Sequence, residues 1–194
     1  MIVVVALGLA LGIQQWIVKP YRIPSGSMEP TLKIGQRVIA SRIYFGGPHV
    51  GEITVFHPPE DAGEQQCGAA PHFVKPGGAA CDETYPRPDN SIQYIKRIVA
   101  GPGDEIYIKD GHAYLREPGK RTFVREHDPY IKSCGESPTC SFTTPIKIPP
   151  GHWFMMGDNR GGSDDSRYWG PVPRSWIIGH AIVTYWPPDR IGFL

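Results

Sequence analysis

Two short segments of this chain carry side chains suited by type and setting to nucleophilic chemistry. Gly26 permits a tight turn that presents the hydroxyls of Ser25 and Ser27 on either side of it, and a hydroxyl becomes a nucleophile when a base removes its proton. Lys96 lies in an apolar stretch, 94–99, whose β-branched residues predict a buried strand. Burial disfavours the ammonium form, so the pKa of Lys96 is expected to fall towards ~7 to 8, where a lysine can act as a general base.

Simpler interpretations exist for both segments. Ser25 and Ser27 could form a helix N-cap or a serine-rich turn, and Lys96 could sit at a strand edge with its amine in water. Histidine is the other common partner of a serine, but none of the seven histidines has a recognisable catalytic setting, and no Gly-x-Ser-x-Gly turn is present. A serine-lysine pair made of Ser27 and Lys96 is therefore the hypothesis that the residues favour.

The elements that must position these residues are predicted to be mainly strands. Gly (23 residues) and Pro (21 residues) are abundant, and the apolar segments are short, β-branched and separated by turns. Asp110-Gly111 between two alternating segments predicts a hairpin. The expected strands are 35–41, 51–56, 93–99, 105–109, 112–116 and 177–186.

The same pattern divides the chain into parts. We expect a catalytic core from residues 20–104 and 149–194, interrupted by a turn-rich surface insertion at 57–91 that is too polar for a core. Residues 105–148 are expected to form a smaller β-rich cap. The Gly-, Asp- and Ser-rich stretch 157–170 follows an apolar run and predicts a shaped loop.

The four cysteines favour disulfides over a metal site, because none lies in a Cys-x-x-Cys pair or near a histidine at zinc spacing. Three connectivities are possible, and proximity in sequence favours Cys67 with Cys81 and Cys134 with Cys140. These pairs would indicate an oxidising compartment. Four free thiols in a cytosolic protein are the alternative.

Residues 1–19 are predicted to form a membrane anchor helix. Residues 2–18 are apolar except for Gln14 and Gln15, with Trp16 and Lys19 where interface anchors belong. A cleavable signal peptide is the alternative, although no basic segment precedes the run. With the cysteines, this predicts a single-pass protein of the cell membrane with its bulk outside the cytoplasm and the lipid bilayer as a partner.

The net charge of +1 offers no case for nucleic-acid binding.

Four motifs, in this order after the apolar run, are similar to those of the bacterial type I signal peptidases. They are Ser25-Gly26-Ser27-Met28 with Pro30-Thr31-Leu32; Gly51 with Ile53, Val55 and Phe56; Tyr94-Ile95-Lys96-Arg97 with Gly101, Gly103 and Asp104; and Gly157-Asp158-Asn159-Arg160 with Ser163, Asp165, Ser166 and Arg167. The resemblance covers residues 21–56, 94–104 and 157–170. Gly161 and Gly162 depart from it, because the family commonly has Asp or Asn there.

The resemblance implies a coiled antiparallel β fold and roles for individual residues. Ser27 would be the nucleophile, Lys96 the general base, and Ser25 a donor to the oxyanion with the Ser27 backbone N–H. Ser163 would hydrogen-bond the lysine amine, and Asp165 and Arg167 would brace its loop. No cofactor or metal is implied.

The resemblance also implies the substrates, which are preproteins with small residues at the first and third positions before the cut. A substrate strand could pair with the extended segment 21–25 and point alternate side chains into shallow apolar pockets. By position, these pockets would be lined by Ile23, Met28, Leu32, Val38, Tyr94 and Ile95, which could equally be core residues.

Two other functions fit the sequence less well. The chain could be a peptidase that matures one dedicated substrate, such as a pilin. It could also be a membrane-tethered, β-rich binding module without catalysis, but such a module has no need of both Ser27 and Lys96.

Overall fold

The protein is mostly β, as predicted. The structure, a computed structural model, describes residues 17–44, 46–60, 62–68, 72–134 and 140–194. Among these residues, the only α-helix is the single turn α2 (Ser166–Trp169). Short 3-10 turns lie at Gly26–Met28, Ala62–Glu64, Arg160–Gly162, Arg174–Trp176 and Pro188–Arg190.

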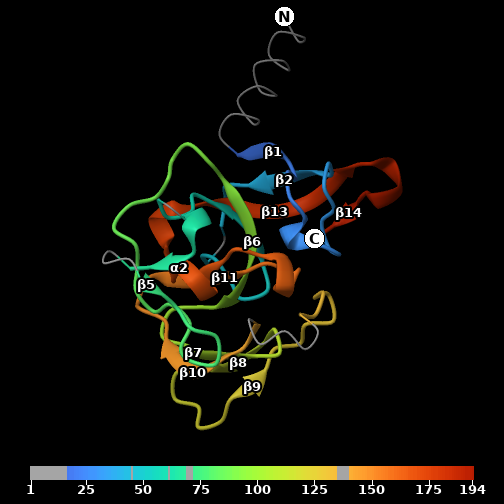
Figure 1. The fold of residues 1–194 in the computed structure, drawn as a ribbon. Coiled ribbons are helices and arrows are strands. Elements are labelled where there is room, and N and C mark those ends of the chain that lie inside the picture. Colours follow the sequence, from blue (N-terminus) through green and yellow to red (C-terminus); the bar gives the residue numbers. More distant parts are fainter. Residues whose placement is uncertain (1–16, 45, 61, 69–71, 135–139) are drawn as a thin grey trace, which may run out of the picture.

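An antiparallel sheet forms the larger part of the molecule (Figure 1). Its described strands are β1 (Val18–Arg22), β2 (Arg37–Ser41), β3 (Ile53–Phe56), β6 (Tyr94–Ala100), β11 (His152–Met156), β12 (Val172–Pro173), β13 (Ile177–Trp186) and β14 (Gly192–Phe193). The order is β1-β2-β13-β3-β6-β11-β12, and β14 pairs with Val183 and Thr184 near the C-terminal end of β13. Register shifts along β13 and between β6 and β11 bend the strands and curl the sheet.

A second antiparallel sheet lies within the residues predicted to form the cap. Its order is β10-β7-β8-β9, with β7 (Glu105–Lys109), β8 (His112–Arg116), β9 (Val124–Arg125) and β10 (Phe142–Lys147). The predicted hairpin is confirmed: Asp110 and Gly111 both have positive φ, 53° and 80°, as a two-residue turn that matches strand twist requires.

One hydrophobic cluster joins the two sheets. Phe154 of β11 and Val99 of β6 pack in it with Ile106 of β7 and Phe142 of β10, and all four side chains are fully buried. The cap is therefore packed on the strand that carries Lys96. The two sheets therefore share one hydrophobic core.

The insertion 57–91 lies only partly on the surface. It contains the two-stranded sheet of β4 (Gln66–Cys67) and β5 (His72–Phe73), but Ala62, Cys81 and Tyr85 are buried. The Cys81 backbone N–H donates to the Arg167 carbonyl of α2 at 3.0 Å. The predicted surface insertion is therefore partly anchored in the core. Its buried residues include the pairs Pro58-Pro59, Cys67-Gly68 and Ala80-Cys81 and form no periodic apolar run that would have indicated this burial.

Both predicted disulfides are present in the structure. Cys67 is joined to Cys81 and Cys134 to Cys140. The first closes the insertion beside α2, and the second lies in the polar stretch that precedes β10.

The predicted anchor helix falls mainly on residues 1–16, outside the residues that the structure describes. Its predicted end at Lys19 is wrong, because Val18 and Lys19 belong to β1 and pair with Ser41 and Ala40 of β2. The residue before a proline is disfavoured in a helix, which explains an extended Lys19 before Pro20. Within the described part of the chain, no helix is long and apolar enough to span a membrane.

Phe154→Ala is expected to lower the free energy of unfolding by about 3–5 kcal/mol, because it empties the cluster that joins the two sheets. Urea unfolding followed by fluorescence measures the change. The matched control is Phe73→Ala in the insertion, where the side chain is 67% exposed and the loss should stay within about 0.5 kcal/mol. Equal losses for the two variants would contradict the assignment of Phe154 to a shared core.

Candidate active site

Lys96 is positioned by the middle of the curled sheet. β6 pairs with β3 along Tyr94–Arg97, where Lys96 lies opposite Thr54, and with β11 only from Arg97 onwards. The Lys96 residue is 4% exposed. The prediction of a lysine on a buried strand is confirmed, and a solvated amine at a strand edge is excluded.

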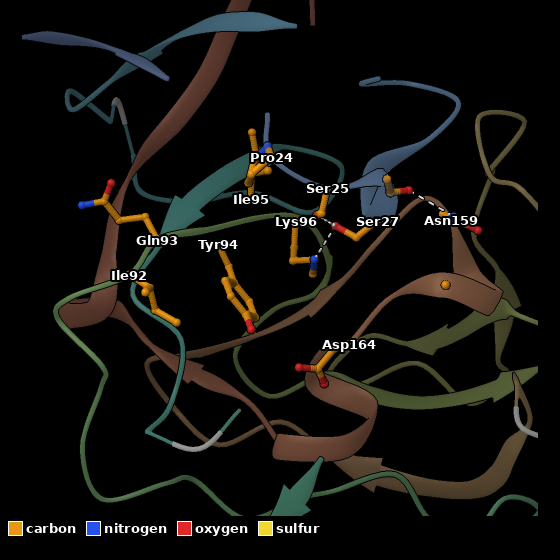
Figure 2. A pocket seen from close by; sticks show the side chains of 12 residues that line it. Pro24, Ser25, Ser27, Ile92, Gln93, Tyr94, Ile95, Lys96, Asn159 and Asp164 are labelled. Atoms are coloured by element: carbon orange, nitrogen blue, oxygen red, sulfur yellow. Dashed lines mark hydrogen bonds between the residues drawn. The ribbon is translucent and has the colours of Figure 1, made fainter. Parts of the chain in front are cut away.

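The serine comes from the turn that follows β1. The 3-10 turn Gly26–Met28 buries Ser27, which is 8% exposed, and brings its Oγ to 2.7 Å from Lys96 Nζ. Figure 2 shows this contact and the neighbouring one, in which Ser25 Oγ lies 3.3 Å from Ser27 Oγ. The three predicted residues are thus brought together from segments 69 positions apart. At 2.7 Å, a neutral amine can accept the hydroxyl proton.

Burial lowers the pKa of Lys96 to about 8. The carboxylates of Asp165, Asp164 and Asp158 raise the pKa of Lys96 and so partly oppose burial. The Arg167 guanidinium lowers it further. The Tyr94 ring, whose centroid is 5.2 Å from Nζ, also favours the ammonium form. At pH 7 about a tenth of the amine is then neutral, far more than for a solvated lysine with a pKa of ~10.4.

The 157–170 loop is held by a buried ion pair. Arg167 donates to both carboxyl oxygens of Asp165, with Nε–Oδ1 at 2.7 Å and Nη2–Oδ2 at 2.9 Å, and both residues are fully buried. Burial acts to raise the pKa of Asp165, but the Arg167 guanidinium outweighs it and the net pKa lies below the usual range. Arg167 also donates to the Ser163 carbonyl at 3.2 Å, and the Gly157 N–H donates to Asp165 at 3.0 Å.

Ser163 lies beside this pair, but its hydroxyl does not form the hydrogen bond to the lysine amine that the family resemblance implies. Ser163 Oγ is buried and has no hydrogen-bond partner among the described residues. It lies against Gly157, where a Cβ would come within 2.2 Å of Ser163 Oγ and 2.4 Å of the Ser27 carbonyl oxygen. Only glycine at position 157 therefore allows the loop to approach Ser27 this closely.

Three residues that fasten the serine turn were quoted in the motifs without a predicted role. Asn159 donates from its backbone N–H to the Ser27 carbonyl and from Nδ2 to the Gly26 carbonyl, both at 3.0 Å. Asp158 is fully buried and forms a bidentate ion pair with Arg97 of β6, at 2.9 and 2.7 Å. The available sequence signal is position: Arg97 directly follows Lys96, and Asp158 and Asn159 belong to the motif that contains Ser163 and Asp165.

A pocket of about 610 Å³ opens beside the Ser27–Lys96 contact (Figure 2). Of the six residues predicted to line apolar substrate pockets, Tyr94 and Ile95 line it. The other four pack together in a buried cluster below the serine turn: Ile23, Met28, Leu32 and Val38. The lining residues absent from the prediction are Pro24, Gly26, Ile92, Gln93, Asn159, Gly162 and Asp164.

Comparison with known proteins identifies the family. The family model described as signal peptidase, peptidase S26, matches residues 1–186. The chain belongs to this family. The resemblance stated from the motifs is therefore confirmed, and the chain is related to serine-type peptidases.

Two relatives illustrate the similarity. The chain is 34% identical over 193 residues to a probable signal peptidase I-2 of Synechocystis sp., a match that covers 98% of this chain and 73% of that protein. It is 32% identical to a signal peptidase I of Leptolyngbya laminosa, over 96% of this chain and 77% of the relative. A solved signal peptidase I structure from Enterococcus faecalis V583 is 21% identical, with a TM-score of 0.38 and coverage of 69% of this chain and 96% of that one.

Tyr94→Glu should shift the acidic limb of the pH–rate profile of this protein to higher pH. Below its pKa the Lys96 amine is protonated and cannot accept a proton, so the wild-type limb is expected near pH 8. A carboxylate beside Lys96 stabilises the ammonium form and moves the limb upwards. Peptide cleavage at limiting substrate measures it, with Tyr94→Gln as the uncharged control.

Two results would contradict this account of Lys96. One is a wild-type limb near ~10, the value of a solvated lysine. The other is a limb that moves down in Tyr94→Glu relative to Tyr94→Gln.

Proposed function

We propose that the chain is a membrane-anchored serine endopeptidase that removes signal peptides from secreted preproteins through a Ser27/Lys96 dyad. The observation that carries this proposal is the 2.7 Å contact between Ser27 Oγ and a buried lysine amine whose pKa is lowered to about 8. A binding module would gain nothing from a buried amine held against a hydroxyl. Membership of the signal peptidase family gives the substrate class.

In the first half of the reaction, Ser27 Oγ attacks the scissile carbonyl carbon and its proton moves to the neutral Lys96 amine. The carbonyl oxygen becomes an oxyanion, and the Ser25 hydroxyl and the Ser27 backbone N–H are the proposed donors to it. When the tetrahedral intermediate collapses, the C–N bond breaks and the Lys96 ammonium returns the proton to the leaving amine. The signal peptide then remains as an ester on Ser27.

In the second half, Lys96 is neutral again and takes a proton from a water molecule that attacks the ester carbonyl. The C–O bond to Ser27 breaks, the serine recovers its proton from Lys96, and the carboxylic product leaves. The ion pairs Asp165–Arg167 and Asp158–Arg97 take no part in proton transfer. They hold the loop and the strand that set the distance between Ser27 and Lys96.

The substrate can bind as an added strand. Because β11 pairs with β6 only from Arg97 onwards, the edge of β6 from Tyr94 to Lys96 has no strand on that side among the described residues. This edge and Pro24-Ser25 line the same pocket. An extended signal peptide placed between them would have its main chain bonded and alternate side chains directed into the pocket, where Ile95 and Tyr94 favour small residues.

The membrane location is supported by exposed apolar side chains at the end of β13, on and around β14, and next to the start of β1. Trp186 is 50% and Phe193 is 93% exposed, and Ile17, Ile191 and Leu194 are also exposed. Lys19 and Arg37 lie on the neighbouring strands β1 and β2. Exposed aromatic residues beside cations are typical of a membrane interface. The two disulfides support a catalytic domain on the extracytoplasmic side.

Ser27→Ala and Lys96→Ala should each reduce single-turnover cleavage of a preprotein by ~10²-fold or more, and the double variant should be no worse than the more damaged single one. The nucleophile and the base act as a unit, so their losses do not add. Near-ultraviolet circular dichroism checks that each variant is folded. A Lys96→Ala variant that keeps more than about a tenth of the wild-type rate would refute the dyad.

Bilayers that carry brominated acyl chains should quench Trp186. For the full chain reconstituted in such bilayers, the quenched fraction of the fluorescence should fall in Trp186→Phe, because this side chain is exposed at the proposed membrane edge. Trp176→Phe removes a buried indole and serves as the matched control, with its quenchable signal unchanged. Equal quenching of wild type and Trp186→Phe would place this edge away from the lipid.

A further inference from the structure

Among the residues that the structure describes, Asp164 is the one carboxyl group that lines the pocket beside Ser27 and Lys96. Both of its carboxyl oxygens are buried, and neither has a hydrogen-bond partner among the described residues. A buried carboxylate without partners is costly, so it is seldom kept without a function. The mechanism above uses the neighbouring Asp165 to hold the loop, but it gives Asp164 no role.

The groups around Asp164 come from its own loop and from β6. In Figure 2 the Tyr94 ring extends from β6 towards Asp164, and the Lys96 side chain extends from the same strand. Asp165, Lys96 and Arg167 act on Asp164 electrostatically, and Asp164 acts on Tyr94 in turn. The Trp169 indole N–H is close enough to favour the ionised carboxyl, but it does not make a well-formed hydrogen bond.

The charge of Asp164 is less compensated than that of Asp165. Arg167 donates to both Asp165 carboxyl oxygens and to the Ser163 carbonyl, so the charge of Asp165 is neutralised within the loop. No comparable partner faces Asp164 in the described part of the chain. Lys96 and Arg167 are the cations that act on it, and of these two Arg167 is already paired with Asp165. Away from bulk water a pair such as Asp164 and Lys96 interacts more strongly than it would on an exposed surface.

We propose that Asp164 is a positioning residue whose charge holds a proton on Lys96 and thereby sets the pH above which the lysine can act as a base. This inference rests on the proposed function of Lys96. Ionised Asp164 stabilises the ammonium form, which opposes the effect of burial. The pKa of Asp164 is raised to about 7, mainly by burial and secondly by the nearby Asp165 carboxylate. Asp164 is therefore charged at the pH where Lys96 loses its proton.

The sign of the effect is fixed by this arrangement. Removing the negative charge destabilises the ammonium form of Lys96 and lowers its pKa, so the acidic limb of activity moves to lower pH. Asp164→Asn keeps the size of the side chain and removes its charge. Its limb in kcat/KM should lie roughly half to one pH unit below that of wild type, and its activity well below the limb should rise about 3- to 10-fold.

Two further variants separate charge at this site from other effects. Asp164→Glu keeps the charge and should return the limb to within about 0.3 pH units of wild type. Asp89→Asn removes the same charge from an exposed site outside the pocket lining, and the Oδ1 atom that accepts both bonds from Ser91 is kept. Its limb should stay where the wild-type limb lies.

A direct titration of Lys96 keeps this inference separate from the proposed function. The full chain is labelled with ¹³C at lysine Cε, Lys96→Ala identifies the signal, and its midpoint is followed by NMR against pH with no substrate present. The expected midpoint is near pH 8 in wild type and roughly half to one unit lower in Asp164→Asn. The same comparison with Asp164→Ala serves if the Asn variant does not fold.

The outcomes are distinct. An Asp164→Asn midpoint that is unchanged or higher than wild type overturns the role of Asp164, whatever the protein cleaves. A lowered midpoint in a protein that cleaves no preprotein supports the influence of Asp164 on Lys96 and counts against the proposed function instead.

Discussion

The burial of a lysine amine against a serine hydroxyl is the interaction on which the rest of the structure depends. An amine in water holds its proton far above neutral pH, and removing water makes the ammonium form costly. The curled sheet provides this environment by placing Lys96 on an inner strand with the serine turn across it. The same strand therefore serves two purposes: β6 lies inside the core, and it carries the amine that we propose as the base for Ser27.

Holding two loops against that strand requires charge within the core. Asp158 pairs with Arg97, the residue after Lys96, and Asp165 pairs with Arg167 beneath Ser163. Buried ion pairs often add little net stability, but losing one partner leaves an uncompensated charge and costs about 3–5 kcal/mol. Their value here is geometric. They fix the backbone at the serine turn and at the 157–170 loop, so that small side chains can be placed within hydrogen-bond distance.

Local chemistry could be predicted well from the sequence. The Asp110-Gly111 turn, the long strand β13 and the pairing of neighbouring cysteines all depend on residues close together in the chain. The Ser27–Lys96 contact could be proposed only by excluding other bases and by family resemblance, since 69 residues separate the two. The apolar character of Ile23 and Met28 fits a core and a substrate pocket equally well, and only packing separates these roles. Asp164 was missed because a single carboxylate in a polar loop carries no pattern.

Acid quenching during turnover tests the central claim most directly. A preprotein is mixed with excess protein, the reaction is stopped at low pH within one turnover, and proteolytic fragments are mapped by mass spectrometry. If the lysine amine activates the serine, the signal peptide will be found as an ester on Ser27, and Lys96→Ala will show almost none. An ester on another residue, or undiminished cleavage by Ser27→Ala, would contradict the account.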